Sequence, residues 1–349
     1  MMAKKWFAMA LKFLVSGILI WLLLSKIDIG DAMGKLVDVE VKMLAMAMLV
    51  ILVQSVICGL RWTAVLLAVG QPLGFLKAVQ FSLIGSFFNQ ALPSAVGGDA
   101  VRMYKAFQYG LGLRCAINGV VLERAITVVA LILLVNALLP WFAPRVDDLM
   151  MKMIFNGLFI ITLGAVLGLF LLMLLDQIPK PLQHWRLMRG LGNLGSDARK
   201  LFLSWYLPRA MIWGFATHIN LSFSVFLLAF GLSVDVSWFD CLVLMPPVIL
   251  VMTLPISIAG WGVRETVMVV LFGLIDVPAE EVVVLSILFG LTCVAMALPG
   301  GVIWLLTRDK GESMNYQTPN EKNSGLDLAK ETVQYSGSKT PRGSFNDKL

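Results

Sequence analysis

Six long apolar runs constrain this chain more than any other feature of its sequence. A helix needs about 20 consecutive apolar residues to cross the hydrocarbon core of a membrane. Hydrophobic residues make up 58% of the 349 residues and charged residues only 14%, so a soluble fold would have a largely apolar surface. The sequence therefore predicts an all-α polytopic membrane protein. The expected full spans are residues 7–25, 43–70, 116–139, 154–175, 210–232 and 282–307.

Two further apolar segments, residues 75–104 and 242–275, are broken by proline and glycine. Each contains a related stretch: residues 92–102 read LPSAVGGDAVR, and residues 254–264 read LPISIAGWGVR. Aligned without a gap, they share Leu-Pro, a glycine at the seventh position and a final Val-Arg. Chance similarity between two Gly/Pro turns is the alternative to an internal repeat. A broken apolar segment that recurs in both halves of a membrane chain is typical of a binding site in transporters.

The distribution of lysine and arginine predicts an orientation if each broken segment is a re-entrant hairpin. The basic residues 102–114 and 180–209 then lie in the cytoplasm, as the positive-inside rule requires. The acidic loops 235–240 and 276–281 lie outside, and both termini are cytoplasmic. The polar residues 310–349 are expected to form a disordered cytoplasmic tail. Two full crossings by each broken segment would keep the same loop sides, so this alternative stays open.

The same crossings predict an inverted-topology repeat. Residues 1–139 contain three spans and the first broken segment, and they enter from the inside. Residues 153–307 repeat that order from the outside. We therefore expect one transmembrane domain over residues 1–309, with the two hairpins approaching from opposite faces.

Several ionisable residues are expected within the membrane, where each costs about 2.5 to 3.5 kcal/mol at a helix centre. Opposite charges lie close together in the sequence, so they either neutralise one another at interface depth or form a polar site. Arg61, which precedes Trp62 near a helix end, is instead expected to extend to the lipid headgroups. The expected pairs are Glu123 with Arg124, Asp99 with Arg102, and Arg264 with Glu265.

The glycines of the two stretches point to anion binding. They permit positive φ angles and close backbone approach, so that backbone N–H groups can face a ligand. A helix that restarts there adds the partial positive charge of its N-terminus, and arginine binds phosphate bidentately. Two such half-sites would suit a phosphate-bearing headgroup, with simple packing of the glycines as the alternative. The candidate substrate-binding residues are Asn89, Gln90, Gly97, Gly98, Asp99, Arg102, Glu123, Arg124, Gly260, Gly262, Arg264 and Glu265.

Other chemistries find little support in the sequence. The four cysteines lie singly in apolar surroundings, without the spacing of a metal site or a disulfide framework. The net charge of +6 fits basic cytoplasmic loops better than a nucleic-acid surface. We therefore expect no metal, no cofactor and no nucleic-acid partner.

At the two stretches the sequence resembles the lysylphosphatidylglycerol synthase transmembrane-region family, also called the flippase-like domain family. Residues 87–104 (FFNQALPSAVGGDAVRMY) are similar to its first signature. Residues 254–265 (LPISIAGWGVRE) and 271–281 (LFGLIDVPAEE) are similar to its second. LERA at residues 122–125 resembles the acidic-Arg pair that follows the first signature. The likeness extends to about residue 307.

The resemblance implies movement of lipids across the bilayer. One branch of the family is the membrane half of the multiple peptide resistance factor, which moves aminoacylated phosphatidylglycerol. The sequence shows no soluble aminoacyl-transferase domain, so neither synthase activity nor any other enzyme activity is expected. Ala259 and Trp261 stand where many relatives have Gly and Leu, and Thr127 stands near a usual Gly. These departures leave the preferred headgroup open.

The leading hypothesis is a lipid flippase or transporter of the cell membrane. Its substrate would be a phosphate-bearing lipid, whether aminoacylated, glycosylated or polyprenyl, with Arg102 and Arg264 contacting the phosphate. One alternative is a membrane-embedded transferase acting on a lipid-linked phosphate. Another is a non-transporting subunit whose basic residues 180–209 dock another protein or anionic lipid. Expected partners are a membrane phospholipid or lipid-linked substrate, and a second copy of the chain or an enzyme of lipid synthesis.

Overall fold

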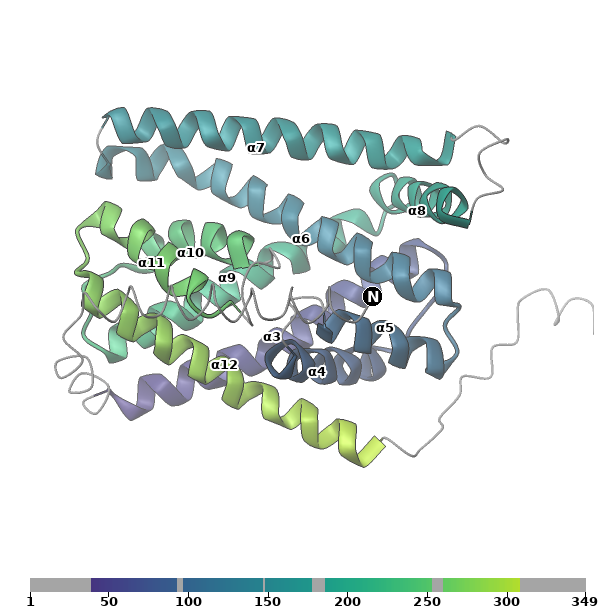
Figure 1. Ribbon diagram of the computed structural model, residues 1–349, viewed down its shortest axis with the longest axis horizontal. Helices are drawn as coiled ribbons and strands as arrows, with labels where there is room; N and C mark the ends of the chain where they lie inside the picture. The colour runs from purple at the N-terminus through teal and green to yellow at the C-terminus, as the bar shows by residue number, and fades with distance from the viewer. Residues whose placement is uncertain (1–38, 93–96, 147, 178–185, 253–259, 308–349) are drawn as a thin grey trace, which may run out of the picture. The chain divides into compact units, whose positions relative to one another are not determined.

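The computed structural model describes residues 39–92, 97–146, 148–177, 186–252 and 260–307 (Figure 1). These residues form α-helices with short 3-10 turns and contain no strand, which confirms the all-α fold. The expected span at residues 7–25 and the expected tail at residues 310–349 lie outside the described residues. The helices are α3 (Val41–Ala68), α4 (Phe75–Ala91), α5 (Gly97–Tyr109), α6 (Leu113–Phe142), α7 (Asp148–Leu174), α8 (Arg186–Phe202), α9 (Leu207–Gly231), α10 (Trp238–Met252), α11 (Val263–Phe272) and α12 (Ala279–Thr307).

Five of the described helices are long and apolar enough to cross a membrane. They are α3, α6, α7, α9 and α12, and they coincide with five of the six spans expected from the sequence. Their apolar side chains do not form a single stripe but surround the helix, as expected for helices in lipid. The chain is therefore a polytopic α-helical membrane protein.

The two broken segments form pairs of short helices. α4 and α5 have 17 and 13 residues, and α10 and α11 have 15 and 10. At a rise of about 1.5 Å per residue, each helix is shorter than the roughly 30 Å hydrocarbon core. α4 packs against α5 and α10 packs against α11. Lengths of this kind are compatible with re-entrant hairpins, which stay a prediction because the connecting residues 93–96 and 253–259 lie outside the described residues.

Helices α3 and α9, the second span of each expected repeat, run antiparallel. The backbone N–H of Glu40, just before α3, donates to the carbonyl oxygen of Gly231 at the end of α9 (3.0 Å). Ten residues further along α3, the carbonyl oxygen of Val50 accepts from the side chain of Asn220 (2.9 Å). The contact therefore moves backward along α9 as the chain moves forward along α3, as an inverted repeat requires.

The helix contacts of the two halves also match the pairing expected of a repeat. α4 packs against α3, α5 and α12, and α10 packs against α9, α11 and α6. Exchanging the two halves of the chain converts one set of contacts into the other. The repeat over residues 1–139 and 153–307 stays a prediction, because residues 1–38 lie outside the described residues.

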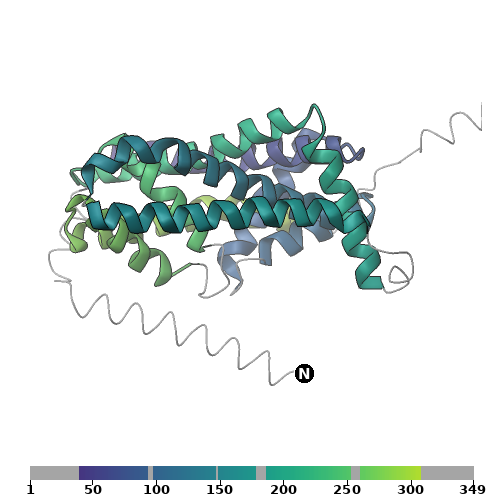
Figure 2. The same cartoon turned by 90° about the horizontal axis from the view of Figure 1, so that it is seen from above.

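Residues 186–202 of the basic stretch 180–209 form helix α8. In Figure 2, α8 crosses the end of α7 instead of running beside it. Its buried Asp197 fixes it to the start of α6, because the carboxylate accepts hydrogen bonds from Arg114 Nη2 (2.9 Å) and Asn118 Nδ2 (2.7 Å). The amphipathic helix is thus held to the first residues of a membrane span.

Gly300 brings α12 against α4. A Cβ atom at this position would lie 2.0 Å from the carbonyl oxygen of Leu83. We expect Gly300→Ala to lower the free energy of unfolding by about 1 to 3 kcal/mol, because the two backbones must separate. Gly164→Ala on α7, where an added Cβ meets nothing within 4 Å, is the matched control. Thermal unfolding in detergent measures the difference, and equal stability of the two variants would contradict the close approach.

Candidate functional site

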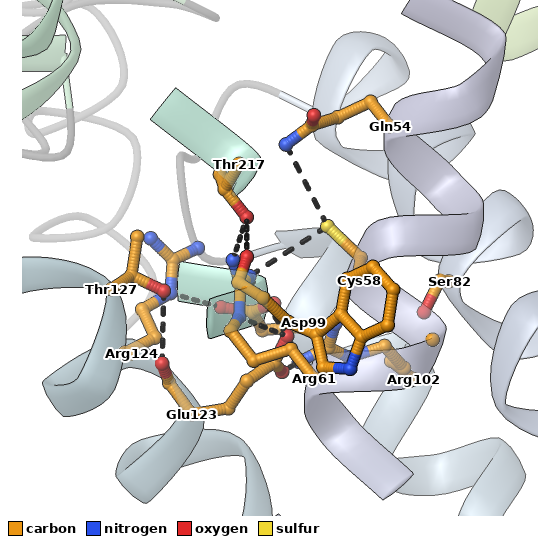
Figure 3. A network of polar contacts seen from close by, with 12 residues as sticks. Gln54, Cys58, Arg61, Ser82, Asp99, Arg102, Glu123, Arg124, Thr127 and Thr217 are labelled. Carbon is orange, nitrogen blue, oxygen red and sulfur yellow. Dashed lines mark hydrogen bonds and ion pairs between the residues drawn. The ribbon is translucent and has the colours of Figure 1, made fainter. Parts of the chain in front are cut away.

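Charged side chains from three helices converge next to the first hairpin (Figure 3). Arg61 comes from α3, Asp99 and Arg102 from the start of α5, and Glu123 and Arg124 from α6. Arg61, Asp99, Arg102 and Glu123 are each between 1% and 7% exposed. So many buried charges are tolerated only when they pair with one another.

Glu123 is the centre of this cluster. Its Oε1 accepts hydrogen bonds from Arg61 Nε (3.2 Å) and Nη2 (2.9 Å). Its Oε2 accepts from Arg102 Nη2, and Arg61 Nη1 donates to the hydroxyl of Thr217 on α9. The expectation that Arg61 extends to the headgroups is therefore wrong. Its partner lies 62 residues away in the sequence, so nothing local to Arg61 indicated the pair.

Asp99 binds the remaining arginine. Arg124 Nε donates to Asp99 Oδ2 (2.5 Å), while Asp99 Oδ1 lies 3.8 Å from Arg102 Nη2. The expected Asp99–Arg102 pair is present, but the expected pairing of Glu123 with Arg124 is wrong. Neighbouring residues on a helix point about 100° apart, so these two side chains face different partners.

The glycines of the first stretch allow α4 and α5 to touch. A Cβ atom on Gly98 would lie 1.9 Å from the carbonyl oxygen of Gly85. The backbone N–H of Gly98 donates to Asn89 Oδ1 (2.9 Å). This hydrogen bond joins the two helices of the hairpin. The N–H group of Gly98, which the sequence predicted to face an anion, therefore already has a partner in Asn89. Among the described glycines, neither Gly97 nor Gly98 has a positive φ, so close approach is what these positions require.

A cavity of about 570 Å³ opens beside the charged cluster. Its size lies within the range of small-ligand sites. Val121 on its wall is 39% exposed, and the Arg124 side chain, one turn further along α6, is 42% exposed. The cavity therefore reaches the surface along α6. Its lining residues are Gln54, Cys58, Arg61, Ser82, Gly85, Ser86, Asn89, Asp99, Arg102, Met103, Val120, Val121, Glu123, Arg124, Thr127, Val128 and Leu221.

The cavity gathers only part of the expected site. Five candidate residues line it: Asn89, Asp99, Arg102, Glu123 and Arg124. Sequence reasoning missed several others, namely Gln54, Cys58, Ser82, Ser86 and Thr127. These polar side chains occur singly on apolar helices, and an unexplained polar residue within a span is the only signal that could have indicated them. Gln90, Gly97 and Gly98 belong to the same hairpin but are not among the lining residues.

The second stretch forms a closed cluster. Arg264 and Glu265 are each 3% exposed, and they form the expected ion pair (2.5 Å from Nη2 to Oε1). Arg264 Nε also donates to Ser286 Oγ of α12 (3.0 Å). The guanidinium carbon lies over the ring of Trp261 (4.7 Å to the centroid) and over that of Phe289 (5.8 Å). This cluster is electrically neutral and already surrounded by protein.

The glycines of the second stretch do adopt the conformations that the sequence suggested. Gly260 and Gly262 have φ angles of +84° and +85°, a region that glycine enters without strain. The backbone N–H of Gly262 donates to Glu265 Oε2 (2.6 Å), which caps the start of α11. This N–H group is therefore bound within the helix cap and does not face a ligand.

The two arginines occupy separate places in the fold. An added Cβ on Gly290 of α12 would lie 2.2 Å from Arg264 Nη2, whereas α12 meets α4 at Gly300. Ten residues of helix separate these contacts by about 15 Å, and Figure 1 shows the two hairpins toward different ends of α12. Gly260, Gly262, Arg264 and Glu265 are not among the residues lining the cavity. The expected contact of Arg102 and Arg264 with one headgroup is therefore not found in the described residues.

Comparison with known proteins decides the family. The model of the family described as the lysylphosphatidylglycerol synthase TM region matches residues 9–301. The chain belongs to this family. A search of curated proteins finds no match. The lysylphosphatidylglycerol synthase TM region is a transmembrane domain and not a catalytic one. Membership relates this membrane protein to the modification or transport of lipids. Within the described ranges, no group of three or more His, Cys, Asp and Glu side chains is placed to hold a metal ion.

Proposed function

We propose that this member of the lysylphosphatidylglycerol synthase TM region family moves a phosphate-bearing lipid across the cell membrane, with both termini in the cytoplasm. Movement would involve no covalent change, so the protein would be a transporter and not an enzyme. The observation that carries the proposal is a cavity within a bundle of membrane helices that holds buried arginines and opens along α6. An arginine-lined cavity offers a charged headgroup the hydrogen bonds it loses on leaving water.

The cavity suits an amphiphilic ligand. Arg61, Arg102 and the polar side chains of α3 and α4 form one part of its wall. Val120, Val121 and Val128 of α6 form an apolar part. The headgroup would occupy the polar part while the acyl chains extend past the exposed Val121 into lipid. The re-entrant hairpin α4–α5 carries Arg102 to this depth without spanning the membrane.

Arg102 provides the test of transport. Arg102→Gln removes one charge but leaves Glu123 bound to Arg61 (2.9 Å), so the fold should persist. A hydrogen bond to a charged group contributes about 1.5 to 3 kcal/mol, which predicts a loss of transport rate of about tenfold or more. The measurement is the movement of a labelled phospholipid between leaflets of reconstituted vesicles.

Arg145→Gln is the matched control, because Arg145 pairs with Asp240 outside the cavity. Wild-type protein should accelerate lipid movement well above protein-free vesicles, and the control should resemble wild type. Movement no faster than in protein-free vesicles would overturn the proposed function. Full activity in Arg102→Gln would contradict the role of the cavity.

The two alternatives from the sequence gain no specific support. A transferase acting on a lipid-linked phosphate and a non-transporting subunit docked through residues 180–209 both stay predictions. The same holds for a second copy of the chain or an enzyme of lipid synthesis as a partner.

A further inference from the structure

The charge balance of the cavity restricts the ligand more closely than the proposed function does. Among the described residues that line it, three are arginines and two are carboxylates: Arg61, Arg102 and Arg124 against Asp99 and Glu123. This part of the wall therefore carries one net positive charge. In a low-dielectric environment, a wall with net positive charge attracts a ligand of opposite sign.

Both carboxylates already pair with arginines, which would compete with a cationic ligand. Glu123 Oε1 binds Arg61 and Oε2 binds Arg102. Asp99 Oδ2 binds Arg124, and Asp99 Oδ1 lies 3.8 Å from Arg102 Nη2. Three of the four carboxylate oxygens accept hydrogen bonds from arginine, and the fourth lies 3.8 Å from Arg102 Nη2. An ammonium group entering the cavity would therefore have to compete with a guanidinium group for each carboxylate.

The groups that remain available are donors. Arg102 Nε and Ser82 Oγ are buried, and neither has a hydrogen-bond partner within the described part of the chain. Arg102 is 7% exposed and Ser82 is 3% exposed, and both residues line the cavity. A buried donor without a partner costs about 1 to 3 kcal/mol. A phosphate oxygen would accept a hydrogen bond from each.

We propose that the cavity selects phosphodiester headgroups that carry net negative charge and no ammonium group, with Arg102 Nε and Ser82 Oγ as contacts to the phosphate. This inference rests on the proposed function, because it names the class of lipid that the same cavity takes. It sets this chain apart from a transporter of aminoacylated lipids, whose headgroups carry added positive charge.

Cys58 is a natural reporter for this inference. It lines the cavity, is partly exposed, and its Sγ lies 3.7 Å from Arg61 Nη2. A variant in which Cys115, Cys241 and Cys293 are replaced would leave Cys58 as the single thiol. The rates of its modification by an anionic and by a cationic methanethiosulfonate reagent report the sign of the charge that the cavity attracts.

We expect the ratio of the modification rates of Cys58, anionic reagent over cationic reagent, to be at least about tenfold higher than the same ratio for a small thiol in solution. A variant that retains only Cys115 is the matched control, because Cys115 lies on α6 but not among the lining residues. Arg102→Gln should remove most of the preference at Cys58. A preference at Cys58 equal to that at Cys115 would overturn the inference.

Protection of Cys58 in nanodiscs then identifies the ligand. Phosphatidylglycerol should slow the modification at least about tenfold more than phosphatidylcholine or lysylphosphatidylglycerol, after correction for the Cys115 control. Equal or better protection by either of the latter lipids would overturn the inference. The proposed function would still stand if vesicles showed lipid movement.

Experiments with soluble anions distinguish a site for a lipid from a site for any phosphate-bearing anion. Inorganic phosphate and glycerophosphoglycerol present the same phosphate chemistry without acyl chains. We expect them to protect Cys58 far less than phosphatidylglycerol. Equal protection by the soluble anions would support an anion site but contradict a lipid substrate.

Discussion

Replacing Glu123 with glutamine is expected to lower the free energy of unfolding by about 3 to 5 kcal/mol, the largest loss of stability from any single change at the site. Glu123 is 1% exposed and accepts hydrogen bonds from both Arg61 and Arg102. Glutamine has nearly the same shape, so the variant isolates the effect of the charge. Two buried guanidinium groups would then face each other without a carboxylate between them.

Thermal or denaturant unfolding in detergent measures this loss. Glu280→Gln, an exposed carboxylate in the first turn of α12, is the matched control and should change stability little. The double variant with Arg61→Gln should recover part of the loss, because it removes one of the two repelling charges. A Glu123→Gln variant as stable as Glu280→Gln would show that the buried cluster does not form.

Val121→Trp is expected to lower the rate of lipid movement at least about tenfold while leaving the fold intact. Val121 lines the cavity and is 39% exposed, so an indole can extend from it without disrupting the protein core. It would occupy the side of the cavity that reaches the surface along α6. Reconstituted vesicles measure the rate, and thermal unfolding checks the fold.

Val302→Trp on α12 is the matched control, because Val302 is 56% exposed and is not among the lining residues. It should move lipid at the wild-type rate. If both tryptophan variants move lipid as fast as wild type, then the headgroup does not pass by the α6 side of the cavity.

The helices could be predicted because the relevant signals are local. Apolar length indicates a span, and the prolines and glycines of residues 92–102 and 254–264 indicate a break wherever the chain is placed. The Arg264–Glu265 ion pair could also be predicted, because its members are adjacent in the sequence. Membership of the family followed from the same two stretches.

The charged cluster could not be predicted because its partners are far apart along the chain. Arg61 and Glu123 are 62 residues apart, and Arg114 and Asp197 are 83 apart. Their pairing depends on how α3, α6 and α8 pack, and a periodic apolar sequence says little about that. The similarity of the two stretches also predicted that both would contact the lipid headgroup. The structure instead gives an open, positively charged cavity at the first stretch and a closed, neutral cluster at the second.

The difference between the two stretches follows from their side chains. Asp99 occupies the position in the first stretch that Trp261 occupies in the second. Trp261 covers Arg264 at 4.7 Å and adds no charge, whereas Asp99 binds Arg124 and leaves the cavity open. The carboxylate that balances Arg264 is its own neighbour, so that arginine needs no ligand.

The most direct test of the central claim is to locate the headgroup by photo-crosslinking. Phosphatidylglycerol with a photoactivatable group on its headgroup would be reconstituted with the full chain, irradiated, and its attachment sites mapped by peptide mass spectrometry. We expect adducts on the cavity residues of α3 to α6, such as Cys58, Ser86 and Met103, and their loss when excess unlabelled lipid competes. Adducts confined to the lipid-exposed surface of α7, unchanged by the competitor, would contradict binding of the headgroup in the cavity.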